Sequence, residues 1–261
     1  MAARSALTRF DLEAASRHLA QHARLDPDDR QGSALRETAL RLSAAREVAA
    51  GARSELEAVL ALQAHVPDEL RAAWHRRVAE LAEADGAGAA RVAGEPVGAH
   101  WLAGGEPARA LESLQASLAH APGDARVRAL AADALYASGQ VEPARREYQR
   151  AFVDGPGDIA LERVADATVS GLVELARDPY ELPEPAVEWV PAVGVVERVF
   201  PLPQPPLPGV LAEPALRPPL EWLALIARER SARALDDRVE IRRRMKQLAP
   251  LLFEAYLGAF A

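Results

Sequence analysis

The sequence contains no cysteine, which excludes disulfide frameworks, thiolate nucleophiles and cysteine-ligated zinc or iron–sulfur sites. It contains a single lysine, Lys246, beside thirty arginines, so lysine chemistry has little scope. No apolar run approaches the roughly 18 residues of a membrane-spanning helix. The N-terminal segment has no uninterrupted apolar core either, because Arg9, Asp11 and Glu13 break it up. We therefore expect a cytoplasmic protein without a membrane span.

Aromatic residues make up only 5% of the chain, and most of its apolar content is alanine and leucine. Both are strong helix formers, so the composition predicts an all-α fold. The 261 residues are enough to bury a core in one or two domains. The formal charge of −7 argues against a nucleic-acid partner, because phosphate binding needs a clustered positive field.

An internal repeat is the strongest pattern in the sequence. Residues 91–124 match residues 125–158 at a constant shift, and the paired positions are Gly105 and Gly139, Ala110 and Ala144, Leu114 and Tyr148, Leu118 and Phe152, and Pro122 and Pro156. Each unit is expected to form two antiparallel helices. The glycines permit the tight turn between the helices, and the prolines end the second helix. Small residues are expected where the helices cross closely, at Gly98, Ala110, Ala132 and Ala144.

The segments VGAHWLAGGEPARALESLQASLAHAPGD and ALYASGQVEPARREYQRAFVDGPGD carry this spacing of small, aromatic, glycine and proline positions. In that spacing the chain resembles the tetratricopeptide repeat family over about residues 91–158. The first unit departs from the family pattern at Ser117, where alanine is preferred. Its first helix is expected to be short because Gly94 and Pro96 lie where it would begin.

The resemblance implies a helical-hairpin α-solenoid in which the first helix of each unit lines a concave groove for a protein or peptide. The groove positions in this sequence are Glu95, Ala99, Leu102, Arg126, Ala129, Asp133 and Tyr136. The lysine and asparagine with which some relatives clamp a terminal carboxylate are absent, so we do not expect that mode of recognition. In the alternative interpretation, these residues pack against the N-terminal helices or against the later proline-rich segment.

Weaker helical patterns flank the repeats. Segments 11–28, 33–50, 54–65 and 68–85 have amphipathic spacing, which predicts degenerate helical hairpins over residues 1–86. A helix at 159–177 is expected to cap the repeats, so that the repeat region spans 87–178, since two repeats alone expose too much apolar surface.

Residues 179–219 hold twelve prolines in forty-one positions, a density that favours extended structure. Within them, AVEWVPAVGVVERVF is rich in β-forming residues, which indicates an ordered arm or a short β segment with Gly194 near a bend. Tail disorder is the competing interpretation. Residues 220–261 return to helix, with Pro250 opening a final helix or kinking a long one. Their apolar character favours docking on the body, partner contact or a homodimer, with Trp189, Phe253, Tyr256 and Phe260 as candidate interface residues.

No catalytic constellation, cofactor motif or metal site is predicted. His18 and His22 have a metal-binding spacing but lack a third ligand, and the acidic turn at Asp26, Asp28 and Asp29 is better explained by helix ends. The sequence therefore predicts a non-enzymatic protein-binding scaffold or adaptor. The alternative is an enzyme or a regulatory subunit whose site is formed by the region after the repeats.

Overall fold

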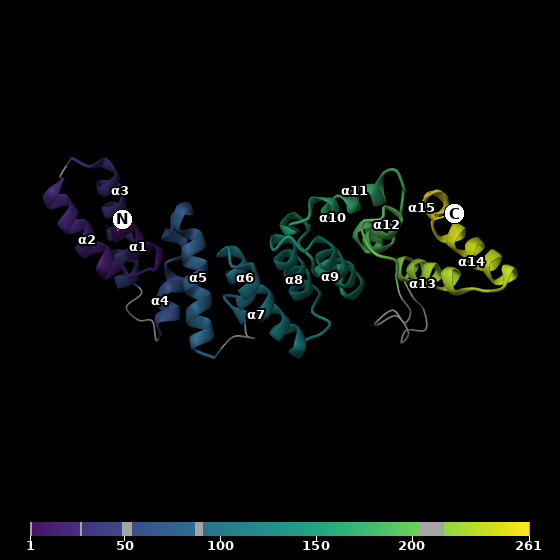
Figure 1. The fold of residues 1–261 in the computed structure, drawn as a ribbon, viewed down its shortest axis with the longest axis horizontal. Helices are drawn as coiled ribbons and strands as arrows, with labels where there is room; N and C mark the ends of the chain where they lie inside the picture. The colour runs from purple at the N-terminus through teal and green to yellow at the C-terminus, as the bar shows by residue number, and fades with distance from the viewer. Residues whose placement is uncertain (1, 27, 49–53, 87–90, 204–216, 261) are drawn as a thin grey trace. The chain divides into compact units, whose positions relative to one another are not determined.

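The computed structural model describes residues 2–26, 28–48, 54–86, 91–203 and 217–260. These residues form an all-α fold of helical hairpins, with a single two-stranded β-hairpin among the described segments, and this confirms the predicted fold class (Figure 1). The chain divides into two compact units, Met1–His120 and Ala121–Ala261, each of which is described by itself. The boundary falls between the two repeats. The predicted division into segments 1–86, 87–178, 179–219 and 220–261 stays a prediction.

The first unit contains the N-terminal helical segments and the first repeat. In chain order its elements are α1 (Ala2–Thr8), α2 (Leu12–Leu25), α3 (Arg30–Val48), α4 (Glu55–Ala61), the 3-10 turn η1 (Gln63–His65), α5 (Asp68–Ala84), β1 (Arg91–Val92), β2 (Glu95–Pro96), α6 (Val97–Ala103) and α7 (Pro107–His120). Side-chain caps start three of these helices. The Asp11 carboxylate accepts a hydrogen bond from the Ala14 amide, the Asp29 carboxylate accepts from the Gln31 and Gly32 amides, and the Ser54 hydroxyl accepts one from the Glu57 amide.

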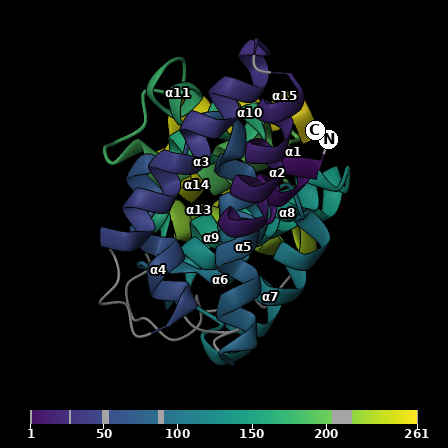
Figure 2. The ribbon, with the colours of Figure 1, turned by 90° about the vertical axis from the view of Figure 1, so that its left-hand side faces the viewer.

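The core of this unit runs along α5. Helix α1 packs against α2 and α5, and α5 packs against α6; Figure 2 shows α1 beside α2 and α5. Leu7, Leu42, Trp74, Trp101 and Leu114 are fully buried there. The indole nitrogen of Trp74 donates to the Val59 carbonyl oxygen at 2.7 Å, so the large ring is buried with its polar atom satisfied.

The first repeat hairpin consists of α6 and α7. Helix α6 is short, as predicted, because β1 and β2 pair in an antiparallel hairpin immediately before it. Gly105 has a φ of 79° in the turn, a conformation that glycine adopts without strain. A Cβ atom on Gly98 would lie 2.4 Å from Cγ of Leu114, so α6 and α7 cross at a distance that only glycine allows.

The second unit begins with the second repeat and continues into a helical C-terminal part. Its elements are α8 (Ala125–Ala137), α9 (Val141–Asp154), η2 (Pro156–Asp158), η3 (Leu161–Arg163), α10 (Ala167–Ser170), α11 (Leu172–Arg177), η4 (Ala186–Trp189), α12 (Val190–Val196), α13 (Pro218–Ser231), α14 (Leu235–Leu248) and α15 (Pro250–Phe260). In the repeat hairpin, Asp124 caps α8 and Gly139 turns the chain with a φ of 76°. Tyr148 and Phe152 of α9 are buried, and α9 ends before Pro156.

The helix predicted at 159–177 is broken into shorter pieces. Residues 161–163 form the 3-10 turn η3, and α10 and α11 follow as separate short helices on either side of Gly171. The carboxylate of Asp166 caps α10 by accepting from the Thr168 amide, which starts a new helix in the middle of the predicted one.

The short β segment predicted near Gly194 is wrong, because residues 186–196 form η4 and the buried helix α12. Helix α12 packs against α9, α11, α13 and α15, and each of its residues from Val190 to Val196 is buried. Packing from several directions overrides the β preference of valine. Gly194 serves another purpose: a Cβ atom there would lie 2.3 Å from Cδ2 of Phe200, so its absence lets the chain fold back. Residues 204–216 of the proline-rich segment lie outside the described residues.

The C-terminal part is a set of three helices, and Pro250 opens the last of them, α15. The arginines of α14 pair with glutamates of α13: Arg242 with Glu229 at 2.7 Å, and Arg244 with Glu221 at 2.6 Å. The basic stretch at 242–244 is therefore used largely to attach α14 to α13. No helix in the described ranges is both long enough and apolar enough to cross a membrane.

Candidate functional site

The candidate groove residues of the second unit form one stripe on α8. Arg126, Ala129, Asp133 and Tyr136 follow a spacing of three, four and three residues, which places them on one helix face; we call them the α8 stripe. Arg126 and Tyr136 are half-buried, whereas Ala129 and Asp133 are 7% and 6% exposed. The exposed area of the α8 stripe therefore lies at its two ends.

The middle of the α8 stripe is covered by the chain itself. The Asp133 carboxylate accepts hydrogen bonds from the Tyr148 hydroxyl and, at 2.8 Å, from the Ala165 amide. Burial raises the pKa of Asp133, and burial together with the nearby Asp133 carboxylate raises the pKa of Tyr148. Asp133 thus anchors the segment that follows the second repeat, which is neither the N-terminal helices nor the proline-rich segment named in the alternative interpretation.

Two further polar networks hold the repeat together. Arg128 of α8 pairs with Glu147 at 3.0 Å and with Asp154 at 2.9 Å, both on α9. Arg145 of α9 pairs at 3.0 Å with Asp166, whose side chain is only 2% exposed. These charges stabilise the hairpin and the turn after it.

Tyr136 is the aromatic residue of the α8 stripe that remains accessible to a partner. Its ring is half-buried near the C-terminus of α8, and its hydroxyl makes no hydrogen bond with any residue of the described ranges. A partly exposed tyrosine offers apolar area for packing together with a polar atom that can donate or accept.

The candidate groove residues of the first unit lie around the short helix α6. Glu95 belongs to β2 and is half-buried, Ala99 is 8% exposed, and Leu102 is half-buried on α6. The use of all seven predicted groove residues for partner binding stays a prediction.

A pair of histidines that sequence reasoning left without a role meets between α5 and α6. The Nδ1 atoms of His75 and His100 are 3.0 Å apart, and the His75 ring meets Trp74 edge-on. Burial lowers the pKa of His100, although the Val92 carbonyl oxygen and Glu95 act in the opposite direction. A spacing of twenty-five residues carries no sequence signal for such a contact.

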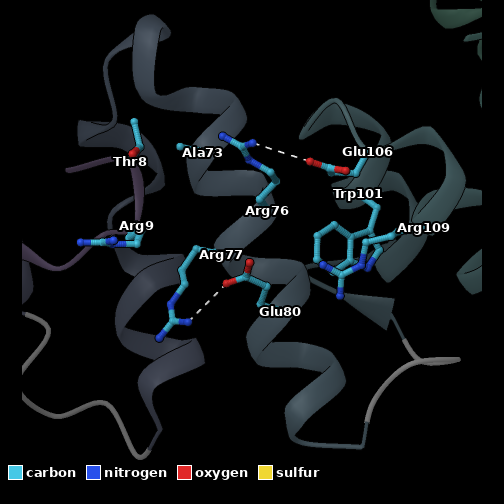
Figure 3. A pocket seen from close by; sticks show the side chains of 9 residues that line it. All are labelled: Thr8, Arg9, Ala73, Arg76, Arg77, Glu80, Trp101, Glu106 and Arg109. Atoms are coloured by element: carbon cyan, nitrogen blue, oxygen red, sulfur yellow. Dashed lines mark hydrogen bonds and ion pairs between the residues drawn. The ribbon is translucent and has the colours of Figure 1, made fainter. Parts of the chain in front are cut away.

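The first unit also contains a polar pocket, which we call the arginine pocket. It is a cavity of about 300 Å³ lined by Thr8, Arg9, Ala73, Arg76, Arg77, Glu80, Trp101, Glu106 and Arg109 (Figure 3). The lining comes from the end of α1, from α5, from α6 and from the start of α7. No local motif links these stretches, so the sequence could not reveal the pocket.

The four arginines of the pocket are held to different degrees. Arg77 pairs with Glu55 at 2.6 Å and with Glu80 at 3.4 Å. Arg109 lies over the Trp101 ring at 3.4 Å and pairs with Glu83 at 3.0 Å. Arg76 is only 3.7 Å from Glu106, and the Arg9 guanidinium has neither an ion pair nor a hydrogen bond with a described residue.

The candidate interface residues near the C-terminus mostly pack inside the second unit. Trp189 and Tyr256 are each 2% exposed and Phe253 is 7% exposed, whereas Phe260 is half-buried. The Tyr256 hydroxyl donates to Glu229 at 3.1 Å, so one buried carboxylate joins α13, α14 and α15. Internal packing accounts for the apolar character of these residues, and their role in a homodimer stays a prediction.

The two histidines with metal-binding spacing lie on the surface of α2. His18 and His22 are both exposed, and His22 Nδ1 is 3.8 Å from Asp29 Oδ2. Across the described segments, no three histidine or carboxylate side chains are grouped so that they could hold a metal ion.

Comparison with known proteins bears on the repeats. Residues 102–165 match the family model described as Tetratricopeptide repeat. No curated protein and no solved structure matches the chain. The matched segment contains α7, α8 and α9, with the turns at Gly105 and Gly139 described above. Residues 102–165 of this chain are therefore similar to the tetratricopeptide repeat family.

Proposed function

We propose that the chain is a non-catalytic cytoplasmic scaffold or adaptor that binds a peptide or a partner subunit through the first helices of its repeats. The tetratricopeptide repeat match supports a role in protein interaction in general. The α8 stripe provides the specific contact.

The observation that carries this proposal is the accessible chemistry at the two ends of the α8 stripe. Arg126 and Tyr136 are ten residues apart, which corresponds to about 15 Å along a helix. An extended segment of about five residues spans that distance. Arginine pairs with carboxylates and tyrosine packs against apolar side chains, so the two ends favour a segment with an acidic and an apolar residue at that separation.

The polar clusters of the second unit support binding over catalysis. Asp133 and Tyr148 bind each other, and Asp166 binds Arg145, so these buried groups stabilise the fold. The alternative from the sequence is an enzyme or regulatory site in the region after the repeats. The residues of η3 to α11 give that alternative no comparable support.

The test is capture of partners with the full chain as bait from cells that make it. Tyr136→Ala and Arg126→Ala are compared with Arg146→Ala, an exposed arginine on the second helix of the same hairpin. The proposal predicts that a protein captured by the wild type is lost from the Tyr136→Ala and Arg126→Ala baits and kept by Arg146→Ala. If the α8 variants retain every captured protein while circular dichroism shows them folded, the α8 stripe is not the binding surface.

A further inference from the structure

We propose that the arginine pocket of the first unit binds a carboxylate side chain from an acidic segment of a protein partner, with Arg9 and Arg76 as the binding cations. The proposal adds a second contact to the scaffold function. It can be tested independently of the α8 stripe, because all of its residues lie between Thr8 and Arg109.

Arg9 supplies a cation that the fold leaves uncommitted. It follows α1 in a tight turn in which Phe10 adopts a φ of 55° and Asp11 caps α2. Ala6 and Leu7, each 0% exposed, fix the end of α1 in the core where it packs against α5. The backbone of Arg9 is thus well anchored, and its side chain is exposed. The Arg9 guanidinium points away from Arg76 (Figure 3), so a ligand that contacts both arginines requires Arg9 to adopt another rotamer.

Arg76 supplies the second cation, and its stem is held in place. A Cβ atom added to Gly104 would lie 2.5 Å from Cγ of Arg76, so the arginine stem packs directly over this glycine. Its guanidinium is 3.7 Å from Glu106, and the two side chains are 40% and 43% exposed. Such an exposed pair contributes little, so a better-placed carboxylate can displace Glu106.

The other two arginines give the pocket its shape. Arg77 is held by Glu55 and Glu80, and Arg109 is held between Glu83 and the Trp101 ring. Figure 3 shows the pairing of Arg77 with Glu80 and Arg109 against the Trp101 ring. Because these partners already neutralise them, Arg77 and Arg109 line the pocket without pairing with the ligand. Arg9 and Arg76 are the arginines that pair with the ligand carboxylate.

The charges and the size of the pocket favour a carboxylate over a phosphate. Glu80 and Glu106 line the cavity as well, and they would repel a dianion more strongly than a monoanion. Arginine binds carboxylates through parallel N–H···O bonds. A cavity of about 300 Å³ lies at the lower end of ligand-site volumes, which suits one or two acidic side chains of a peptide.

The test measures the anisotropy of a fluorescein-labelled peptide, Gly-Glu-Glu-Glu-Glu-Gly amide, with the full chain at low salt. The glutamine peptide of the same length is the uncharged comparison. We expect the glutamate peptide to bind at least about tenfold more tightly. Arg9→Ala and Arg76→Ala should each weaken that binding about tenfold or more, the loss of one charge-assisted contact.

Further variants distinguish binding at this pocket from nonspecific electrostatic attraction and from binding at the α8 stripe. Arg17→Ala removes an exposed arginine of α2 and should leave the affinity unchanged within about twofold. Glu106→Gln should tighten binding several-fold, because it frees Arg76 from its competitor. Glu112→Gln, which removes an exposed carboxylate of α7 outside the pocket, should give a smaller gain and controls for the change in net charge. Tyr136→Ala should have no effect, which keeps this test distinct from that of the α8 stripe.

The proposal is overturned if the wild type does not distinguish the two peptides, or if Arg17→Ala weakens binding as much as Arg9→Ala and Arg76→Ala. It is also overturned if inorganic phosphate displaces the glutamate peptide at lower concentration than acetate does, since the pocket would then be an oxyanion site of another kind.

Discussion

Gly98→Ala is the substitution whose effect the structure specifies most closely. A Cβ atom at Gly98 would lie 2.4 Å from Cγ of Leu114 and 2.9 Å from the Ala110 carbonyl oxygen. Carbon atoms in contact are normally about 3.5–4.0 Å apart, so α6 and α7 must separate by about 1 Å. Leu114 is 0% exposed, so neighbouring side chains enclose it on all sides.

The magnitude follows from two opposing effects. Overpacking a close helix contact costs about 1–3 kcal/mol, whereas alanine in a helix gains about 0.5–1 kcal/mol over glycine. Because the Cβ contact of 2.4 Å is far below the normal separation, the overpacking cost lies in the upper part of its range, about 2–3 kcal/mol. The free energy of opening of the α6–α7 hairpin should therefore fall by about 1–2.5 kcal/mol, an increase of about 5- to 70-fold in the population of the open hairpin.

Gly258→Ala is the matched control. Gly258 lies within α15, and an added Cβ would meet nothing within 4 Å. No steric clash then opposes the higher helix propensity of alanine, and the substitution should stabilise α15 by about 0.5–1 kcal/mol.

Hydrogen exchange followed by mass spectrometry reads each hairpin separately. The expected result is faster exchange in peptides from residues 97–120 of Gly98→Ala and slower exchange in peptides from residues 250–260 of Gly258→Ala. Unchanged or slower exchange at 97–120 in Gly98→Ala would refute the close crossing of α6 and α7.

Three other predictions concern buried polar groups and can be checked by urea unfolding. Because burial lowers the pKa of His100, the unfolded chain protonates this residue at a higher pH than the folded chain does. The free energy of unfolding should therefore fall as the pH drops below about 6.5, and His100→Gln should weaken this dependence. Burial raises the pKa of Tyr256 to about 12, so the contribution of its neutral hydroxyl to the free energy of unfolding should be lost as the pH rises from about 10 through 12. In Tyr256→Phe this part of the pH dependence should be absent. Asp133→Ala should cost about 2–4 kcal/mol, because it leaves the Tyr148 hydroxyl and the Ala165 amide without their acceptor; a cost below about 0.5 kcal/mol would contradict the anchoring role of Asp133.

The repeats could be predicted from the sequence because local residues determine their geometry. Gly105 and Gly139 mark turns that require a positive φ, and Pro156 marks the end of a helix, wherever the hairpins lie in the fold. The short α6 could be predicted for the same reason, since Pro96 can precede a helix but cannot lie within one.

Features that depend on contacts between distant segments escaped sequence reasoning. The valines of α12 have the composition of a strand, and only their burial by α9, α11, α13 and α15 explains why they form a helix. Asp133 has the spacing of a groove residue, yet its carboxylate binds the Ala165 amide. The arginine pocket likewise brings together residues from distant parts of the first unit, such as Arg9 and Arg109.

Site-specific photo-crosslinking tests the central claim most directly. With p-benzoylphenylalanine at position 136 of the full chain, irradiation in cells that make the protein should yield a cross-linked partner whose attached peptide is identified by mass spectrometry. The same group at position 146 should yield no such product. Equal cross-linking from both positions, or none from position 136 although the partner is captured, would contradict the assignment of the α8 stripe as the surface that binds it.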